Sequence, residues 1–255
     1  MLKLGIVQMS VREGMVDKNC RKARELVKRY AEDDIDLLCF PELCISGYNF
    51  ERAASSDREA EFFSELAAEY HIAILAGIQI AEGKRHYDVA CLWNEEGELL
   101  GEYRKIHLWA TENDFFEKGD KLVTVPFKGW NLGMLICADY GFPELSTPLA
   151  QKLDADVILY PSAWGAGWED LFSTCSKMRA AENQVYTVAL NRACGDMEYC
   201  GNTTVSNPDG TVLLRMETLG EAYARVVLEK KKLKEAREAI PWRNMKRYDV
   251  YNKLI

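Results

Sequence analysis

Three residues of this chain are of types that can together perform acyl transfer: Cys137, Glu42 and Lys105. Cys137 closes the apolar run GMLIC, and a thiol becomes a nucleophile when a base or a nearby cation favours its thiolate. Glu42 follows the apolar run LLCFP, where partial burial would raise the pKa of its carboxyl and suit it to general base work. Lys105 ends a strand-like run and could supply positive charge. Taken singly, each residue also fits an ordinary place as apolar filler, surface acid or surface lysine.

The segments around these residues form a more specific pattern. They read PELCISGY at 41–48, YRKIHL at 103–108 and LICADYGFPE at 135–144. Further along come MRAAENQVY at 178–186, the pair Asn191-Arg192 and GNTTVSNPDG at 201–210. In order and spacing, these segments resemble the nitrilase superfamily of carbon–nitrogen hydrolases, in particular its small amidases and omega-amidases. The resemblance runs from the first predicted strand to about residue 228, nearly the whole chain.

The resemblance implies a role for four residues. Cys137 matches the nucleophile, Glu42 the general base and Lys105 the lysine that stabilises the tetrahedral intermediate, while Glu112 matches a second glutamate that orients substrate and lysine. The implied reaction is hydrolysis of a non-peptide C–N bond of a small linear amide through a cysteine thioester, without a cofactor. The oxyanion would be held by Lys105 and by the backbone N–H of Ala138.

Two positions depart from the pattern of the resemblance. Ala138 follows the nucleophile where relatives usually carry a bulky aromatic residue, and Asp88 stands where asparagine is frequent. In relatives, the region that corresponds to the loop 161–168 recognises the tail of the substrate. Together with two aromatic residues elsewhere, this loop predicts an aromatic-lined pocket, although core packing explains any single aromatic equally well. The predicted substrate-binding residues are Tyr48, Trp109, Ala138, Ser162, Ala163 and Trp164.

Several alternative functions stay open at this point. Within the family they are an N-carbamoyl amine hydrolase and a nitrilase; the lack of an arginine pair in the loop 161–168 disfavours N-carbamoyl amino acids. A papain-like dyad would instead pair Cys137 with His107. A glutaminase module would need a separate synthetase as its partner. A non-catalytic scaffold would be expected to lack some of the four residues, and all four are present.

The elements that must position these residues alternate between strands and helices. Apolar runs predict strands, and apolar residues at helical spacing predict helices. A hairpin is expected at 87–105 around the turn 94–97. The other predicted strands are 2–9, 35–40, 72–80, 131–137, 156–160, 185–191, 203–206, 212–215 and 222–228, and the helices are 18–30, 58–70, 144–153 and 168–183.

This order favours a layered α/β sandwich with mixed sheets over a parallel barrel. The resemblance implies the four-layer αββα form, which commonly dimerises. No linker or repeat is visible, so a single domain is expected over 1–255. Its unperiodic tail, 241–255, is predicted either to pack on its own body or to reach a partner subunit, as in a homodimer.

Composition excludes several other classes of protein. The net charge is −8, from 32 basic and 40 acidic residues, which disfavours binding to nucleic acid or to an anionic membrane. No apolar stretch approaches the roughly 20 residues of a membrane span, and the N-terminus does not resemble a signal peptide. Eight cysteines without a CxxC pair and only three histidines indicate reduced thiols and no metal site. A cytoplasmic enzyme is expected.

Overall fold

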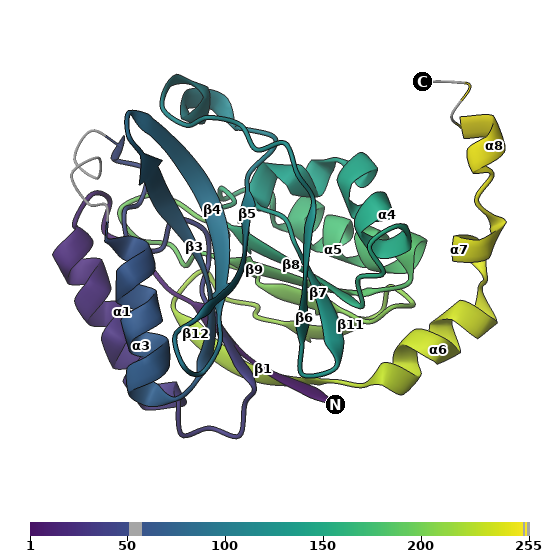
Figure 1. Cartoon of the computed structure of the whole chain (residues 1–255), viewed down its shortest axis with the longest axis horizontal. Coiled ribbons are helices and arrows are strands. Elements are labelled where there is room, and N and C mark those ends of the chain that lie inside the picture. Colours follow the sequence, from purple (N-terminus) through teal and green to yellow (C-terminus); the bar gives the residue numbers. More distant parts are fainter. Residues whose placement is uncertain (51–57, 252, 254–255) are drawn as a thin grey trace.

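The computed structural model describes residues 1–50, 58–251 and 253, and builds them on two six-stranded sheets. The first sheet has the strand order β12-β1-β2-β3-β4-β5 and the second β11-β10-β9-β8-β7-β6 (Figure 1). Both sheets mix parallel and antiparallel pairs. The strands are β1 (Leu2–Gln8), β2 (Leu37–Cys39), β3 (Ala73–Glu82), β4 (Arg85–Trp93), β5 (Leu99–Arg104), β6 (Val123–Phe127), β7 (Trp130–Met134), β8 (Val157–Ser162), β9 (Tyr186–Asn191), β10 (Thr204–Ser206), β11 (Val212–Arg215) and β12 (Ala222–Leu228).

Helices cover the outer face of each sheet. The helices α1 (Val16–Tyr30) and α3 (Glu59–Tyr70) pack against the first sheet, and α4 (Pro143–Gln151) and α5 (Glu169–Asn183) lie on the second (Figure 1). In α1 the buried residues Asn19, Ala23 and Val27 recur every four positions, which gives the helix one inward stripe. The two outer layers of helices and the two sheets make the αββα sandwich that the resemblance implied.

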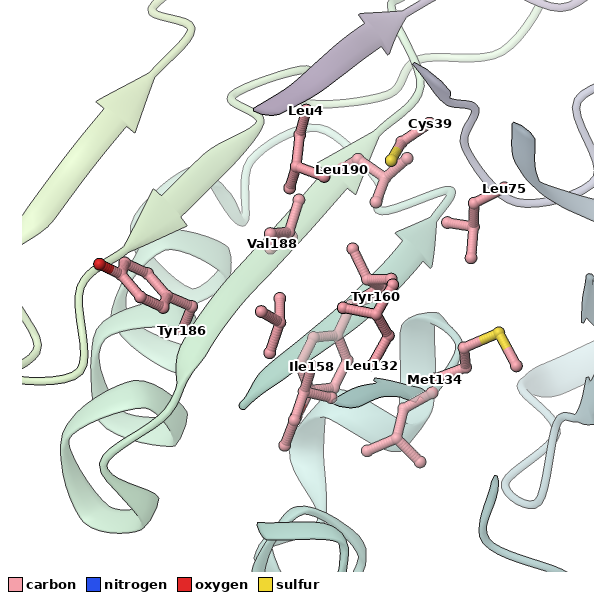
Figure 2. Packing of buried hydrophobic residues seen from close by; sticks show 14 of the residues in the cluster. Leu4, Cys39, Leu75, Leu132, Met134, Ile158, Tyr160, Tyr186, Val188 and Leu190 are labelled. Atoms are coloured by element: carbon pink, nitrogen blue, oxygen red, sulfur yellow. The ribbon is translucent and has the colours of Figure 1, made fainter. Parts of the chain in front are cut away.

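The main core lies between the two sheets. Strand residues such as Leu4 and Leu75 face Leu132 and Val188 of the other sheet, and all four are fully buried (Figure 2). Because the central strands are covered on both faces, their sequences are nearly continuous apolar runs, which is why they could be predicted.

Most predicted elements are confirmed, with shifted ends, and the hairpin forms between β4 and β5. The edge strand β6 was not predicted; it contains Pro126, and proline is depleted in strands. The strand predicted at 131–137 ends at Met134, and Cys137 begins the short 3-10 helix η2 (Cys137–Gly141). A second one is η1 (Ala110–Asp114).

The C-terminal segment contains further helices, the first of which carries the basic run 230–237. They are α6 (Lys230–Ala239), α7 (Trp242–Met245) and α8 (Tyr248–Tyr251), which follow one another along the side of the molecule beside α4 (Figure 1). Within the described ranges, none of the helices is long and apolar enough to span a bilayer.

Candidate active site

Glu42 lies in the turn that follows β2. Two other segments of the protein hold the backbone of this turn in place. The fully buried Arg192 donates from Nε to the Glu42 carbonyl at 2.8 Å and from Nη2 to the carbonyl of Leu43. Leu43 has a positive φ of 44°, which a non-glycine residue adopts only when its surroundings enforce it. On the other side, Gly77 of β3 comes so close that a Cβ there would lie 2.5 Å from the Glu42 Cα.

Lys105 follows β5 and brings the carboxylates together. Its ammonium donates to Glu42 Oε1 at 2.6 Å and to Glu112 at 2.8 Å, and it lies 3.4 Å from Asp88 Oδ2. All four side chains are fully buried. Carboxylate oxygens of the three acids lie within 4.8 Å of one another, a spacing that could also suit a metal ion. Because Lys105 contacts all three acids, its ammonium supplies the compensating cation.

Glu112 is held by three donors. Besides Lys105, the Tyr48 hydroxyl donates to Oε1 at 2.7 Å and the Trp109 backbone N–H to Oε2 at 2.8 Å. Both oxygens are therefore engaged. This arrangement suits a residue that orients Lys105.

Cys137 stands at the start of η2 in a strained conformation. Its φ is 40°, in the left-handed region, and only 7% of the residue is exposed. The Ala163 backbone lies beside the thiol and slightly lowers its pKa. Burial is the largest influence and raises the pKa of Cys137 well above its usual value, Glu42 raises it further, and Lys105 lowers it. The Cys137 side chain is thus a neutral thiol within electrostatic reach of a carboxylate.

The protonation of Glu42 differs from the sequence-based expectation. Burial alone would raise the pKa of Glu42, but the Lys105 charge, the neighbouring Asp88 carboxyl and the Arg192 charge outweigh it, so the pKa lies below its ordinary value. The expectation of a raised pKa was wrong because the sequence could not show a cation at 2.6 Å. Glu42 is therefore ionised and able to accept the thiol proton.

Asp139 connects the lysine segment to the nucleophile segment. Its Oδ1 accepts from the His107 backbone N–H at 2.9 Å and pairs with the His107 ring Nδ1 at 2.9 Å, while its Oδ2 accepts from the Tyr103 hydroxyl at 2.7 Å. The His107 ring also stacks on Phe142, with 3.6 Å between centroids. These contacts give His107 a structural place, and within the described part of the chain it makes no hydrogen bond to Cys137. The papain-like dyad has no support.

The predicted substrate-binding residues lie in different surroundings. Tyr48 is engaged with Glu112, Ala138 follows Cys137 in η2, and Ala163 contacts the thiol through its backbone. Trp109 is 69% exposed although its backbone N–H contacts Glu112. Substrate contact by these residues stays a prediction.

The other two predicted substrate-binding residues, Ser162 and Trp164, lie at the end of β8 and just after it. Ser162 is buried and donates to the Tyr160 carbonyl at 3.0 Å. The Trp164 backbone N–H donates to Asn191 Oδ1 at 2.7 Å. Its ring packs on Phe172 at the edge of the core, as the packing alternative had it. The aromatic-lined pocket stays a prediction.

Sequence reasoning noted the pair Asn191-Arg192 but assigned it no role. In the structure, Asn191 fixes the 162–164 loop and Arg192 fixes the Glu42 turn. Asp139 was likewise missed. For Arg192 the available signal was a charged residue directly after a buried apolar strand, which indicates a residue that needs specific partners.

Comparison with known proteins places this geometry in context. A family model described as carbon-nitrogen hydrolase matches residues 3–237. The chain is 34% identical to a nitrilase of Pyrococcus abyssi, with 84% of each chain covered, and 32% identical to an (R)-stereoselective amidase of Pseudomonas, with 83% of this chain and 80% of the relative covered. The crystal structure of Nit3 from Saccharomyces cerevisiae, a nitrilase superfamily member, superposes with a TM-score of 0.86 at 26% identity over 94% of both chains.

Proposed function

This chain belongs to the carbon–nitrogen hydrolase family, and on that premise we propose that it hydrolyses small linear amides with Cys137, Glu42 and Lys105 as catalytic residues. The observation that carries the proposal is the fully buried ion pair between Lys105 and Glu42, at 2.6 Å, beside a buried thiol on a strained turn. A buried ion pair is costly for stability, so its presence next to a nucleophile indicates a chemical use.

The first half-reaction forms a thioester. Glu42 takes the proton of the Cys137 thiol as the sulfur bonds to the amide carbon, and the resulting oxyanion is stabilised by the Lys105 ammonium and the Ala138 N–H. Glu42 then gives its proton to the nitrogen as the C–N bond breaks, so ammonia or an amine leaves. Loss of one oxyanion donor of this kind lowers kcat by about 10²–10³.

The second half-reaction releases the acid. Glu42 takes a proton from water, whose oxygen attacks the thioester carbon. The C–S bond breaks, Cys137 regains a proton, and a carboxylic acid leaves. Glu112 acts by holding Lys105 in place, since both of its oxygens are bound by fixed donors.

The amide substrate class is supported by the names of relatives. The Pseudomonas relative is named an amidase, and a yeast relative, 26% identical over 98% of this chain, is named an omega-amidase. Tyr48, Trp109, Ser162, Ala163 and Trp164 are proposed to contact the acyl group. We also propose a cytoplasmic enzyme, because all eight cysteines are free, and a homodimer in which the tail 241–255 contacts the partner.

The test is ammonia release from aliphatic amides, ω-amides, N-carbamoyl amines and nitriles, with Cys137→Ala as control. Wild type should release ammonia from at least one amide, and the variant should lose about 10⁴-fold or more in kcat. Equal activity of the two proteins would overturn the role of Cys137. Preference for the carbamoyl or nitrile compounds would replace the amide substrate by that class.

A further inference from the structure

Asp88, in the middle of β4, is a buried acid without an evident donor. The residue is 1% exposed, and among the described residues no hydrogen bond reaches either of its carboxylate oxygens. The same holds for the second oxygen of Glu42, Oε2. Lys105 is 3.4 Å from Asp88, but its ammonium makes shorter contacts with Glu42 and Glu112. Buried polar atoms without partners are rare and require an explanation.

The charges around Lys105 do not balance if every acid is ionised. Oxygens of Glu42, Asp88 and Glu112 lie within 4.8 Å of one another, and one ammonium contacts them all. Like charges at this separation in a dry interior favour retention of a proton by one of the acids. One proton between Asp88 and Glu42 would reduce the repulsion and also pair Glu42 Oε2 with one of the two Asp88 oxygens.

The proton belongs on Asp88 rather than on Glu42. Glu42 has the closest contact to Lys105, at 2.6 Å, and Arg192 lies against its backbone carbonyl. Asp88 lies farther from the Lys105 ammonium, at 3.4 Å. The directions of the pKa shifts agree with this distribution. Burial raises the pKa of Asp88 well above its ordinary value, with Glu42 raising it further, whereas the pKa of Glu42 is lowered.

We propose that Asp88 is a positioning residue, a neutral carboxylic acid that donates its O–H to Glu42 Oε2 and keeps this base ionised and aimed at Cys137. Glu42 is then held through both oxygens, Oε1 by Lys105 and Oε2 by Asp88. The catalytic significance of this bond rests on the proposed function, in which Glu42 is the base; the presence of the proton does not.

The surroundings of Asp88 define its pH dependence. The charged groups that face it are Glu42, Lys105 and Glu112, and the Tyr48 phenol also lies within electrostatic reach. On the adjacent strand β3, the residue paired with Asp88 is the uncharged Gln79.

His86 lies two residues earlier on β4, and its ring pairs with Gln79 Nε2 at 3.1 Å. The neutral form of Asp88 is the active one. Activity should therefore fall as the pH rises through the pKa of Asp88 in the folded protein, when a second carboxylate forms beside Glu42.

Asp88→Asn is the informative variant because an amide can donate to Glu42 but cannot ionise. It should keep kcat/KM within about threefold of wild type near neutral pH, and its alkaline limb should move to higher pH. Asp88→Ala offers no donor and should lose about 10- to 100-fold, the effect of removing a hydrogen bond to a charged group. Equal losses in both variants, or an unchanged alkaline limb in Asp88→Asn, would overturn the proposal.

Two substrate-free measurements separate this inference from the proposed function. The infrared difference spectrum between wild type and Asp88→Asn should show loss of a protonated carboxyl C=O band near neutral pH. Asp156→Asn, which removes an ion-paired aspartate outside the site, should leave that band unchanged. If the lost band is that of an ionised carboxylate, Asp88 carries no proton and the inference fails, whatever the activity.

The second measurement is the rate of Cys137 alkylation by iodoacetamide against pH, read by mass spectrometry of the Cys137 peptide. Its profile should shift in Asp88→Asn relative to wild type, because Asp88 controls the charge beside the base. An unchanged profile would show that Asp88 does not act on Glu42 and would overturn the positioning role.

Discussion

At the scale of single residues, Lys105 determines the charge state of the site. It is fully buried, and its ammonium contacts Glu42, Glu112 and Asp88. Burial alone would lower the pKa of Lys105, but the surrounding acids raise it well above its ordinary value. The same cation keeps Glu42 ionised, so the stability of the site and the readiness of its base depend on one ammonium.

Replacement of Lys105 by methionine should therefore destabilise the protein in a pH-dependent way. The uncompensated acids lower the free energy of unfolding by about 3–5 kcal/mol near neutral pH. Without the cation, the carboxyl pKa values in the folded state lie above those in the unfolded state, so folding takes up protons and the loss shrinks as the pH falls. Urea unfolding near pH 5 and pH 8 measures both free energies.

Lys230→Met is the matched control for this prediction. Lys230 pairs with Asp156 but is 48% exposed, so its removal should lower the free energy of unfolding by at most about 1 kcal/mol. A loss for Lys105→Met that is the same at both pH values would contradict the charge argument.

At the scale of elements, β3 determines where the turn after β2 can lie. Gly77 lies against the Glu42 backbone, and its own N–H donates to the Pro41 carbonyl at 3.2 Å. In Gly77→Ala, the new Cβ would stand 2.5 Å from the Glu42 Cα, so the turn must shift. Displacement of a catalytic group on the order of 1 Å costs about 10²-fold in rate, and we expect a loss of that size in kcat/KM for amide hydrolysis.

Gly220→Ala provides the comparison for this variant, because a Cβ there meets only Thr218 Oγ1, at 3.5 Å. Its activity should match wild type. Wild-type activity in Gly77→Ala would show that the Glu42 turn tolerates displacement.

The first turn of α3 carries a further buried acid, Glu59, outside the active site. It accepts the Gln79 backbone N–H at 3.1 Å, and burial raises its pKa to about 8. The folded protein therefore holds a proton that the unfolded chain releases near its ordinary pKa. Stability should fall as the pH rises from about 5 to 8, by up to about 1.4 kcal/mol per pH unit, and level off above. Glu59→Gln should flatten this slope in urea unfolding series.

The exposed Glu61 of the same helix gives the control. Glu61→Gln should leave unchanged the slope of the free energy of unfolding against pH that Glu59 causes. A slope that persists in Glu59→Gln would assign the titration to another group.

Elements could be predicted from sequence where burial leaves a regular pattern. The central strands are apolar on both faces, whereas β6 contains a proline and half-exposed residues and gave no such signal. The proposed catalytic residues were found through their motifs. The clamp by Arg192 and the bridge by Asp139 were not, because they join residues 150 and 32 positions apart in the chain. Long-range contacts of single polar side chains leave no periodic trace in a sequence.

At the scale of the whole molecule, the C-terminal helices are attached by polar contacts and leave apolar side chains exposed. Lys246 donates to Thr147 at 3.2 Å, and Arg243 pairs with Asp154. Trp242 and Met245 of α7, in contrast, are 47% and 65% exposed. The tail therefore contacts its own body, as one predicted alternative had it, while its apolar side chains remain available to a second copy.

If the tail contacts a partner subunit, loss of these two apolar side chains should weaken the dimer. The double variant Trp242→Ser/Met245→Ser keeps the polar contacts of the tail but removes the side chains with the most apolar area to bury. Buried apolar surface contributes roughly 25 cal/mol per Å², so the dissociation constant should rise by a factor of 10 or more. Sedimentation velocity over a concentration series measures it. Leu219→Ser changes a residue of similar exposure, 50%, outside the tail and should leave the dimer intact. An unchanged dimer in the double variant would place the interface elsewhere, and a monomeric wild type would refute the homodimer.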